Sequence, residues 1–165
     1  MPSQLVAVLV WLSIAALSRF MPHPPNATAI GAMALLGAFY LQPRWLSLFL
    51  PLVALFLTDL VLGFHNTMIW TYGAFALISW ISYQKKFSVK NLGLSSFAAS
   101  TLFFVVSNFG VFVTGAYGFS WAGLVNCYVM AIPFFGYQLA GDLFYSTLIV
   151  GSYHFFFARE KALTV

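Results

Sequence analysis

The chain has 165 residues, of which 62% are hydrophobic and only 6% are charged, and its mean hydropathy is +0.92. Soluble domains carry about 25% charged residues, so this composition cannot build a water-facing surface and excludes an ordinary soluble enzyme. Long apolar runs without strict alternation favour helices over barrel strands, because lipid leaves only these two ways to satisfy the backbone. We therefore predict an all-α polytopic membrane protein with one domain, residues 1–165.

The excess of seven Lys and Arg over three Asp and Glu gives a pI near 9.4. So few basic residues indicate membrane topology and no nucleic-acid partner. The single cysteine, Cys127, excludes an internal disulfide and a thiolate metal cluster. The apolar N-terminus lacks the positive region of a signal peptide, so it is interpreted as a first membrane helix.

Six apolar segments are predicted to cross the bilayer, although the first two are shorter than the ~20 residues of a perpendicular span. Their ranges are 4–20, 27–41, 45–64, 67–83, 92–115 and 133–157. The aromatic, uncharged stretch 116–132 is a candidate interfacial helix. Six spans leave Arg19 alone on one side and put the other six basic residues on the side of both termini. The positive-inside rule then predicts that both termini are cytoplasmic. The sequence has a bacterial style, so we expect a multi-pass protein of the cell (inner) membrane.

Small residues recur four apart in the second segment, at 27–31 and 34–38. This spacing lets helix backbones approach closely in lipid. Two interpretations stay open: close packing within the bundle, and a docking groove for another membrane subunit.

Polar side chains are expected to gather in the outer half of the bundle. At a rise of ~1.5 Å per residue, Asp59 lies roughly 7 Å and Asp142 roughly 13 Å below the outer helix ends. A carboxylate inside a membrane segment is costly unless it meets a partner or a wet cavity. The candidate substrate-binding residues are Asp59, Asn108, Gln138, Asp142 and Tyr145, and the candidate loop or rim residues are Arg19, His23, Asn26 and His65.

The alternative for these residues is structural: an ion pair between Arg19 and Asp59, with inter-helix hydrogen bonds that fix packing. Asp142 lies deeper and shares a helix face with Gln138 and Tyr145, which favours a wet cavity at this position. Two carboxylates with aromatics suggest a ligand that carries an amine or a ring nitrogen, with Arg19 left for an acidic group. No set of residues predicts a metal site, a catalytic centre or a cofactor.

Four motifs carry a resemblance to known proteins: RFMPHPPN (19–26), TDLVLGFH (58–65), SNFG (107–110) and GDL (141–143). Together they resemble an uncharacterised family of proposed membrane transport proteins related to the substrate-binding S component of energy-coupling factor (ECF) transporters. The resemblance covers nearly the whole chain.

The resemblance implies a non-enzymatic capture subunit for uptake of a vitamin or a similar small micronutrient through an outward-facing pocket. It also implies a membrane coupling subunit with two cytoplasmic ATPases as partners, since the chain has no Gly-rich phosphate loop. The first helix has Ala15 and Ala16 without the Ala-xxx-Ala docking pattern, so a solitary transporter is the alternative. The rival functions are a membrane scaffold or assembly subunit whose polar groups only pack helices, and then an intramembrane enzyme.

Overall fold

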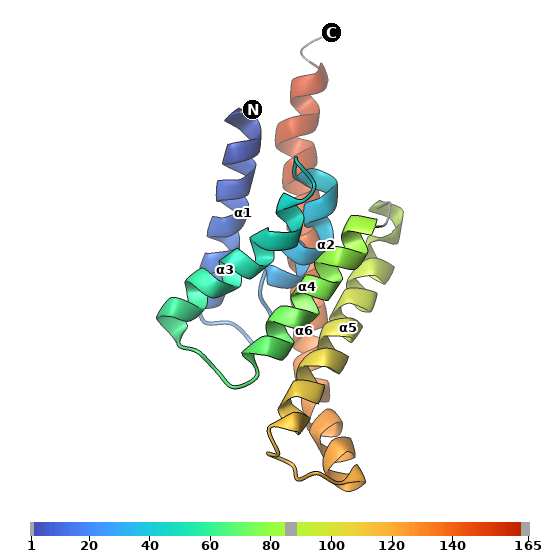
Figure 1. Ribbon diagram of the computed structural model, residues 1–165. Helices are drawn as coiled ribbons and strands as arrows, with labels where there is room; N and C mark the ends of the chain where they lie inside the picture. Colours follow the sequence, from blue (N-terminus) through green and yellow to red (C-terminus); the bar gives the residue numbers. More distant parts are fainter. Residues whose placement is uncertain (1, 85–88, 163–165) are drawn as a thin grey trace.

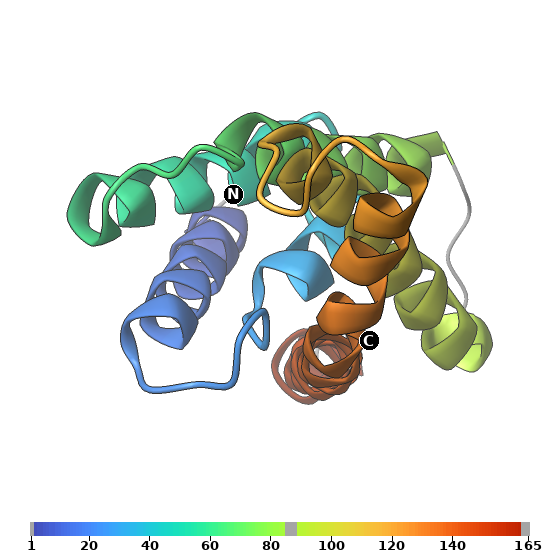
Figure 2. The ribbon, with the colours of Figure 1, turned by 90° about the horizontal axis from the view of Figure 1, so that it is seen from below.

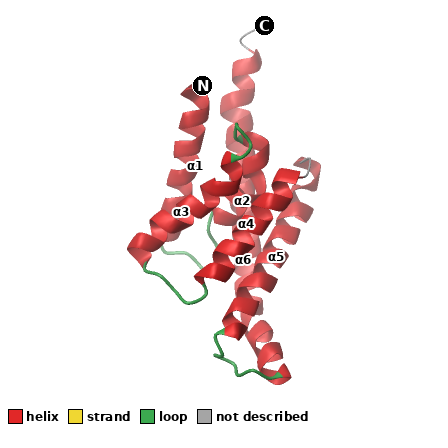
Figure 3. Ribbon diagram, viewed as in Figure 1, coloured by secondary structure: helices red, strands yellow, loops and turns green. Residues whose placement is uncertain are grey.

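The computed structural model describes residues 2–84 and 89–162, and every regular element within them is helical (Figure 3). This confirms the predicted all-α class. The elements in order are α1 (Pro2–Phe20), α2 (Ile30–Tyr40), α3 (Leu46–Leu62), α4 (Met68–Gln84), the short 3-10 helix η1 (Val89–Asn91), α5 (Leu92–Val113) and α6 (Trp121–Ala162). The first five predicted segments end within three residues of α1 to α5.

The six α-helices of the described chain alternate in direction (Figure 1). The start of α1, the end of α6, the α2–α3 turn and η1 lie at one end of the bundle, called here the terminal end. The loops 21–29, 63–67 and 114–120 lie at the other, called here the loop end. Arg44 therefore belongs to the terminal end, whereas Arg19 belongs to the loop end. Lys85 and Lys86, which contribute to the predicted charge asymmetry, lie outside the described residues.

Helix α2 lies in the middle of the bundle, as the view along the bundle shows (Figure 2). Its residues from Ile30 to Ala38 are all buried. Small side chains make this position possible: a Cβ at Gly37 would lie 2.9 Å from the Cβ of Ser47 on α3. The close packing that the small residues of this segment predict is therefore present within the chain itself.

At the terminal end, Arg44 joins α2, α3 and α4. Its Nε donates to the carbonyl oxygen of Ala38 at 3.1 Å, and its Nη2 donates to the carbonyl oxygen of Tyr83 at 2.6 Å. The last carbonyls of a helix have no partner within the helix, so a guanidinium that reaches two helix ends stabilises both.

Helix α6 is longer than predicted, because residues 121–132 continue into it instead of forming a separate interfacial helix. Pro133 lies inside it. A proline removes one helical hydrogen bond and pushes against the preceding turn, which accounts for the bend between the orange and the red parts of α6 in Figure 2. The predicted depth of Asp142 assumed that this helix begins at Pro133. Because the helix begins at Trp121, its start lies about 18 Å further from Asp142 along the helix.

Two helices in the described chain are long and apolar enough to cross a membrane, α5 and residues Trp121–Tyr153 of α6. Shorter apolar helices cover Leu5–Phe20, Ile30–Tyr40 and Leu46–Leu62. These lengths are compatible with a membrane protein.

The contact between α4 and α5 provides a test of the packing. Trp70 lies directly on Gly110, where an added Cβ would overlap the base of the indole side chain, whereas a Cβ at Gly73 or Gly93 would meet nothing within 4 Å. We expect Gly110→Ala to lower the free energy of unfolding by about 1–3 kcal/mol, because the two helices must separate to admit the methyl group. Gly73→Ala and Gly93→Ala, the matched controls, should leave stability unchanged or raise it slightly. Thermal unfolding of the purified protein in detergent measures all three, and equal losses would contradict the packing.

Candidate functional site

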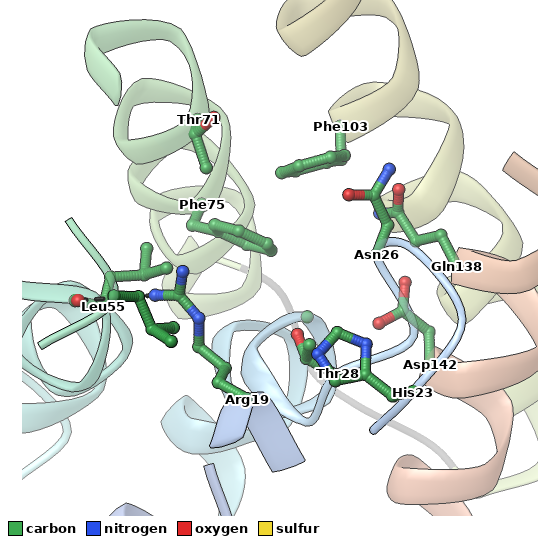
Figure 4. Close-up of a pocket in the computed structure, with 12 residues that line it drawn as sticks. Arg19, His23, Asn26, Thr28, Leu55, Thr71, Phe75, Phe103, Gln138 and Asp142 are labelled. Atoms are coloured by element: carbon green, nitrogen blue, oxygen red, sulfur yellow. Dashed lines mark hydrogen bonds between the residues drawn. The ribbon is translucent and has the colours of Figure 1, made fainter. Parts of the chain in front are cut away.

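A cavity of about 280 Å³ lies between the 21–29 loop and helices α1 to α6 (Figure 4). Its polar lining comes mostly from the loop and from α6, and its apolar lining from α3, α4 and α5. The residues that line it are Arg19, His23, Asn26, Thr28, Gly31, Leu55, Leu62, Thr71, Phe75, Phe103, Gln138 and Asp142. His23 and Asn26 are exposed, so the cavity reaches the surface at the loop end of the bundle.

The 21–29 loop places Asn26 at this opening through a tight turn. The amide of Ala27 donates to the carbonyl oxygen of Pro24 at 3.0 Å, and Asn26 has a φ of 64°. Proline at the second position and a residue with positive φ at the third are the features of a type II turn, and asparagine tolerates that conformation better than most residues. The sequence Pro24-Pro25-Asn26-Ala27 therefore fixes the rim locally.

Asp142 lies at the inner part of the cavity and is 3% exposed. The hydroxyl of Ser100 donates to its Oδ2 at 2.7 Å. Its carboxylate lies against Gly31, where a Cβ would overlap it, and Gly31 belongs to the first turn of α2. The N-terminus of a helix carries unpaired N–H groups and a partial positive charge, so it favours a carboxylate at this place. The N-cap residue of α2, Ala29, supplies no side-chain cap of its own.

Gln138 lies one helical turn before Asp142 and is also 3% exposed. The amide of Gln138 has one atom that accepts hydrogen bonds, Oε1. This Oε1 is buried and has no hydrogen-bond partner. Opposite these polar groups, the rings of Phe75 and Phe103 form an apolar wall, with their centroids 4.6 Å apart.

Arg19 reaches the cavity from the end of α1, but its charge is paired with Asp59 on α3. Nη2 of Arg19 lies 2.7 Å from Oδ1 of Asp59, and Nη1 donates to the hydroxyl of Thr58 at 2.7 Å. The hydroxyl of Tyr72 donates to the second oxygen of Asp59 at 2.7 Å. Asp59 is 1% exposed, so this pair is largely shielded from solvent. The ion pair, one of the two alternatives for Asp59, is present.

The structure brings five of the nine candidate residues to one cavity, namely Arg19, His23, Asn26, Gln138 and Asp142. The other four do not line it. Asp59 is bound by Arg19 and Tyr72, and Asn108 donates from Nδ2 to the carbonyl oxygen of Phe104 in its own helix. The ring of Tyr145 packs against Phe144 and the apolar core. His65 is exposed, and its ring lies beside Thr67. Among the described residues, no three His, Cys, Asp or Glu side chains are close enough to share a metal ion.

Sequence reasoning missed several contributors to the site. Ser100 and Gly31 carry no signal in the sequence, because serine and glycine are common on packed membrane helices. Phe75 and Phe103 could not be singled out from the sequence, because the chain has 19 phenylalanines.

Two serines on one face of α5 provide a matched pair to test the contacts of Asp142. Ser96 and Ser100 are both 0% exposed and one helical turn apart, but the hydroxyl of Ser96 has no partner. Ser100→Ala removes a hydrogen bond to a buried carboxylate and should lower the free energy of unfolding by about 1.5–3 kcal/mol. Ser96→Ala should leave it unchanged or raise it. Thermal unfolding in detergent compares the two, and a larger loss for Ser96→Ala would be inconsistent with this geometry.

Residues 1–163 match the model of a family of unknown function (DUF6580). Curated proteins and solved structures gave no match. The match extends over all helices that contribute to the cavity, and the chain therefore belongs to this family of unknown function, DUF6580.

Proposed function

We propose that this protein is a multi-pass protein of the cell (inner) membrane, with six spans and both termini in the cytoplasm. The surface of the bundle supports this proposal, because several of its helices carry large apolar side chains that are strongly exposed. Val61 on α3, Ile69 on α4 and Leu94 on α5 are 74%, 76% and 72% exposed. Exposed apolar surface on this scale is typical of a membrane-facing protein. The shorter helices would then cross a locally thinned bilayer.

Within that membrane we propose a substrate-capture subunit, similar to the S component of ECF transporters, for uptake of a vitamin or a similar micronutrient. The observation that carries this proposal is the cavity at the loop end, into which the buried polar groups of Gln138 and Asp142 project. A concave, mainly apolar site with a few convergent polar groups is the usual form of a small-molecule site. With the termini in the cytoplasm, its opening faces outward, where such a subunit meets its ligand.

The energy for uptake would come from a membrane coupling subunit with cytoplasmic ATPases, or the chain would act alone. Transfer of a captured ligand needs either a partner or a movement of the helices themselves. The small buried residues of α2 are already occupied by α3 and α6, so they leave no free groove for a partner at Gly31 or Gly37.

A scaffold subunit is the second candidate, and specific contacts favour it. Asp142 binds Ser100 and the start of α2, and Asp59 binds Arg19 and Tyr72, so both carboxylates join helices. Such contacts alone would stabilise a bundle that binds nothing. The unpaired Oε1 of Gln138 distinguishes the two functions. A capture subunit would use it to bind its ligand, whereas helix packing alone gives no reason to bury an unpaired acceptor.

Membrane topology has a direct test. In a Cys127→Ser background, Asn66→Cys lies in the loop-end segment 63–67 and Lys90→Cys in η1 at the terminal end, and both native side chains are exposed. We expect a membrane-impermeant maleimide to label the cysteine at position 66 in intact cells and the one at position 90 only after the cells are opened. Labelling of both positions from the outside would contradict six spans.

Ligand capture is tested by thermal unfolding of the detergent-solubilised protein against a panel of vitamins and nucleobases. A ligand at 100 times its dissociation constant should raise the free energy of unfolding by about 2.7 kcal/mol. We expect Gln138→Ala to weaken this stabilisation, because the side chain lines the cavity, and Asn108→Ala to preserve it, because Asn108 does not. The absence of any stabilising compound, together with a general loss of folding in Asp142→Asn, would favour the scaffold.

A further inference from the structure

We propose that the cavity binds a small planar organic cation with neighbouring N–H donors, such as an amidinium or a protonated amino-heterocycle. This inference rests on the proposed function, since it names the class of ligand for the same cavity. It follows from the distribution of charge and of unpaired acceptors among the side chains that line the site.

The described lining of the cavity carries no permanent positive charge without a negative partner. Arg19 is the lining residue with a permanent positive charge, and its guanidinium is 2.7 Å from the carboxylate of Asp59. Its Nη1 is also occupied by the hydroxyl of Thr58, with the carbonyl oxygen of Leu55 at 3.4 Å. A ligand carboxylate or phosphate would have to compete with a buried, charge-assisted contact that is already made. Arg19, which the sequence offers as a group for an acidic ligand, is therefore not free to serve as one.

Asp142 has no cationic partner in the part of the chain that the structure describes. The salt bridge between Arg19 and Asp59 is the one found among the described residues, so no described cationic side chain lies within 4.0 Å of Asp142. Ser100 and the first turn of α2 provide one hydroxyl and about half a positive charge. Of the other titratable groups in the lining, His23 lies at the exposed rim, with its Nδ1 2.8 Å from the carbonyl oxygen of Pro24. A carboxylate in an apolar bundle is stabilised when a cation reaches it.

The polar wall of the cavity offers two hydrogen-bond acceptors side by side. Gln138 and Asp142 lie four residues apart on α6, so their side chains share one helix face. The buried Oε1 of Gln138 needs a donor, and the carboxylate beside it accepts more than the one bond from Ser100. Two neighbouring acceptors on one helix face match a ligand that presents two N–H groups on one edge.

The size and the aromatic wall of the cavity favour a flat ligand. The aromatic rings of Phe75 and Phe103 line the same cavity, and an aromatic face attracts a delocalised cation. The volume of about 280 Å³ is at the lower limit of ligand pockets, which span roughly 300–1,000 Å³, so it suits a ligand of about one ring. Planarity, positive charge and adjacent donors are together the properties of an amidinium or an amino-heterocycle.

Three compounds of nearly equal shape separate these properties: benzamidine, benzamide and benzoate, which are cationic, neutral and anionic. Their dissociation constants for the full-length protein in detergent are measured by the concentration dependence of its thermal unfolding, at constant ionic strength. We expect benzamidine to bind about 10- to 100-fold more tightly than benzamide, the range for a hydrogen bond to a charged group, and benzoate not to bind. Asp142→Asn should bring benzamidine and benzamide to within about threefold of each other, whereas Asn108→Ala should keep the difference.

The order of the three ligands in the wild-type protein decides the matter even if Asp142→Asn does not fold. In that case Gln138→Leu replaces it, and this change should weaken benzamidine and benzamide alike. Benzoate binding as well as benzamidine, equal binding of benzamidine and benzamide, or binding of none of the three would overturn the inference. The proposed capture function fails separately, when no compound of the vitamin and nucleobase panel stabilises the protein, so an anionic or neutral ligand found there would refute only the charge assignment.

Discussion

Gly31 lets a carboxylate of α6 lie directly against the first turn of the central helix α2. A side chain at this position would overlap Asp142, and the same α6 segment approaches the loop before α2 at Gly141, where a Cβ would lie 2.8 Å from Cα of Ala27. Helices α2 and α6 are therefore joined through a polar contact at Gly31, and Gly141 lets α6 approach the loop before α2. This contact fixes where the 21–29 loop crosses the bundle, and through it the position of the cavity rim.

The two buried carboxylates have different surroundings, although both lie in long apolar helices. Asp59 is neutralised by Arg19 and held by Tyr72, so it joins α1, α3 and α4. Asp142 has a hydroxyl and a helix start but no cationic side chain among the described residues. In a medium of low dielectric constant, the charge of Asp59 is already balanced by Arg19, whereas Asp142 would be stabilised by a cation. The charge character of the cavity thus depends on which carboxylate Arg19 reaches.

Several predictions from the sequence rest on periodicity and composition, and these agree with the structure. Apolar runs bounded by proline or by short polar stretches predicted α1 to α5 within three residues of their observed ends, and the small residues of α2 predicted its close packing. The pairing of Arg19 with Asp59 was one of two alternatives, since Arg19 is the one Lys or Arg that six spans place on the outer side. The start of α6 was misplaced because Pro133 was treated as a helix boundary, whereas the helix bends there and continues.

The sequence by itself determined the helical class, the apolar surface and the set of polar residues from which a site can be built. Only the tertiary structure decided which of these residues meet: Gln138 and Asp142 line the cavity, while Asn108 bonds to its own helix and Tyr145 packs against the core. The physical reason is that helical periodicity fixes the face on which a side chain lies, but not the rotation or height of its helix relative to the neighbours. Contacts such as Ser100 with Asp142 span 42 residues of chain and depend on both.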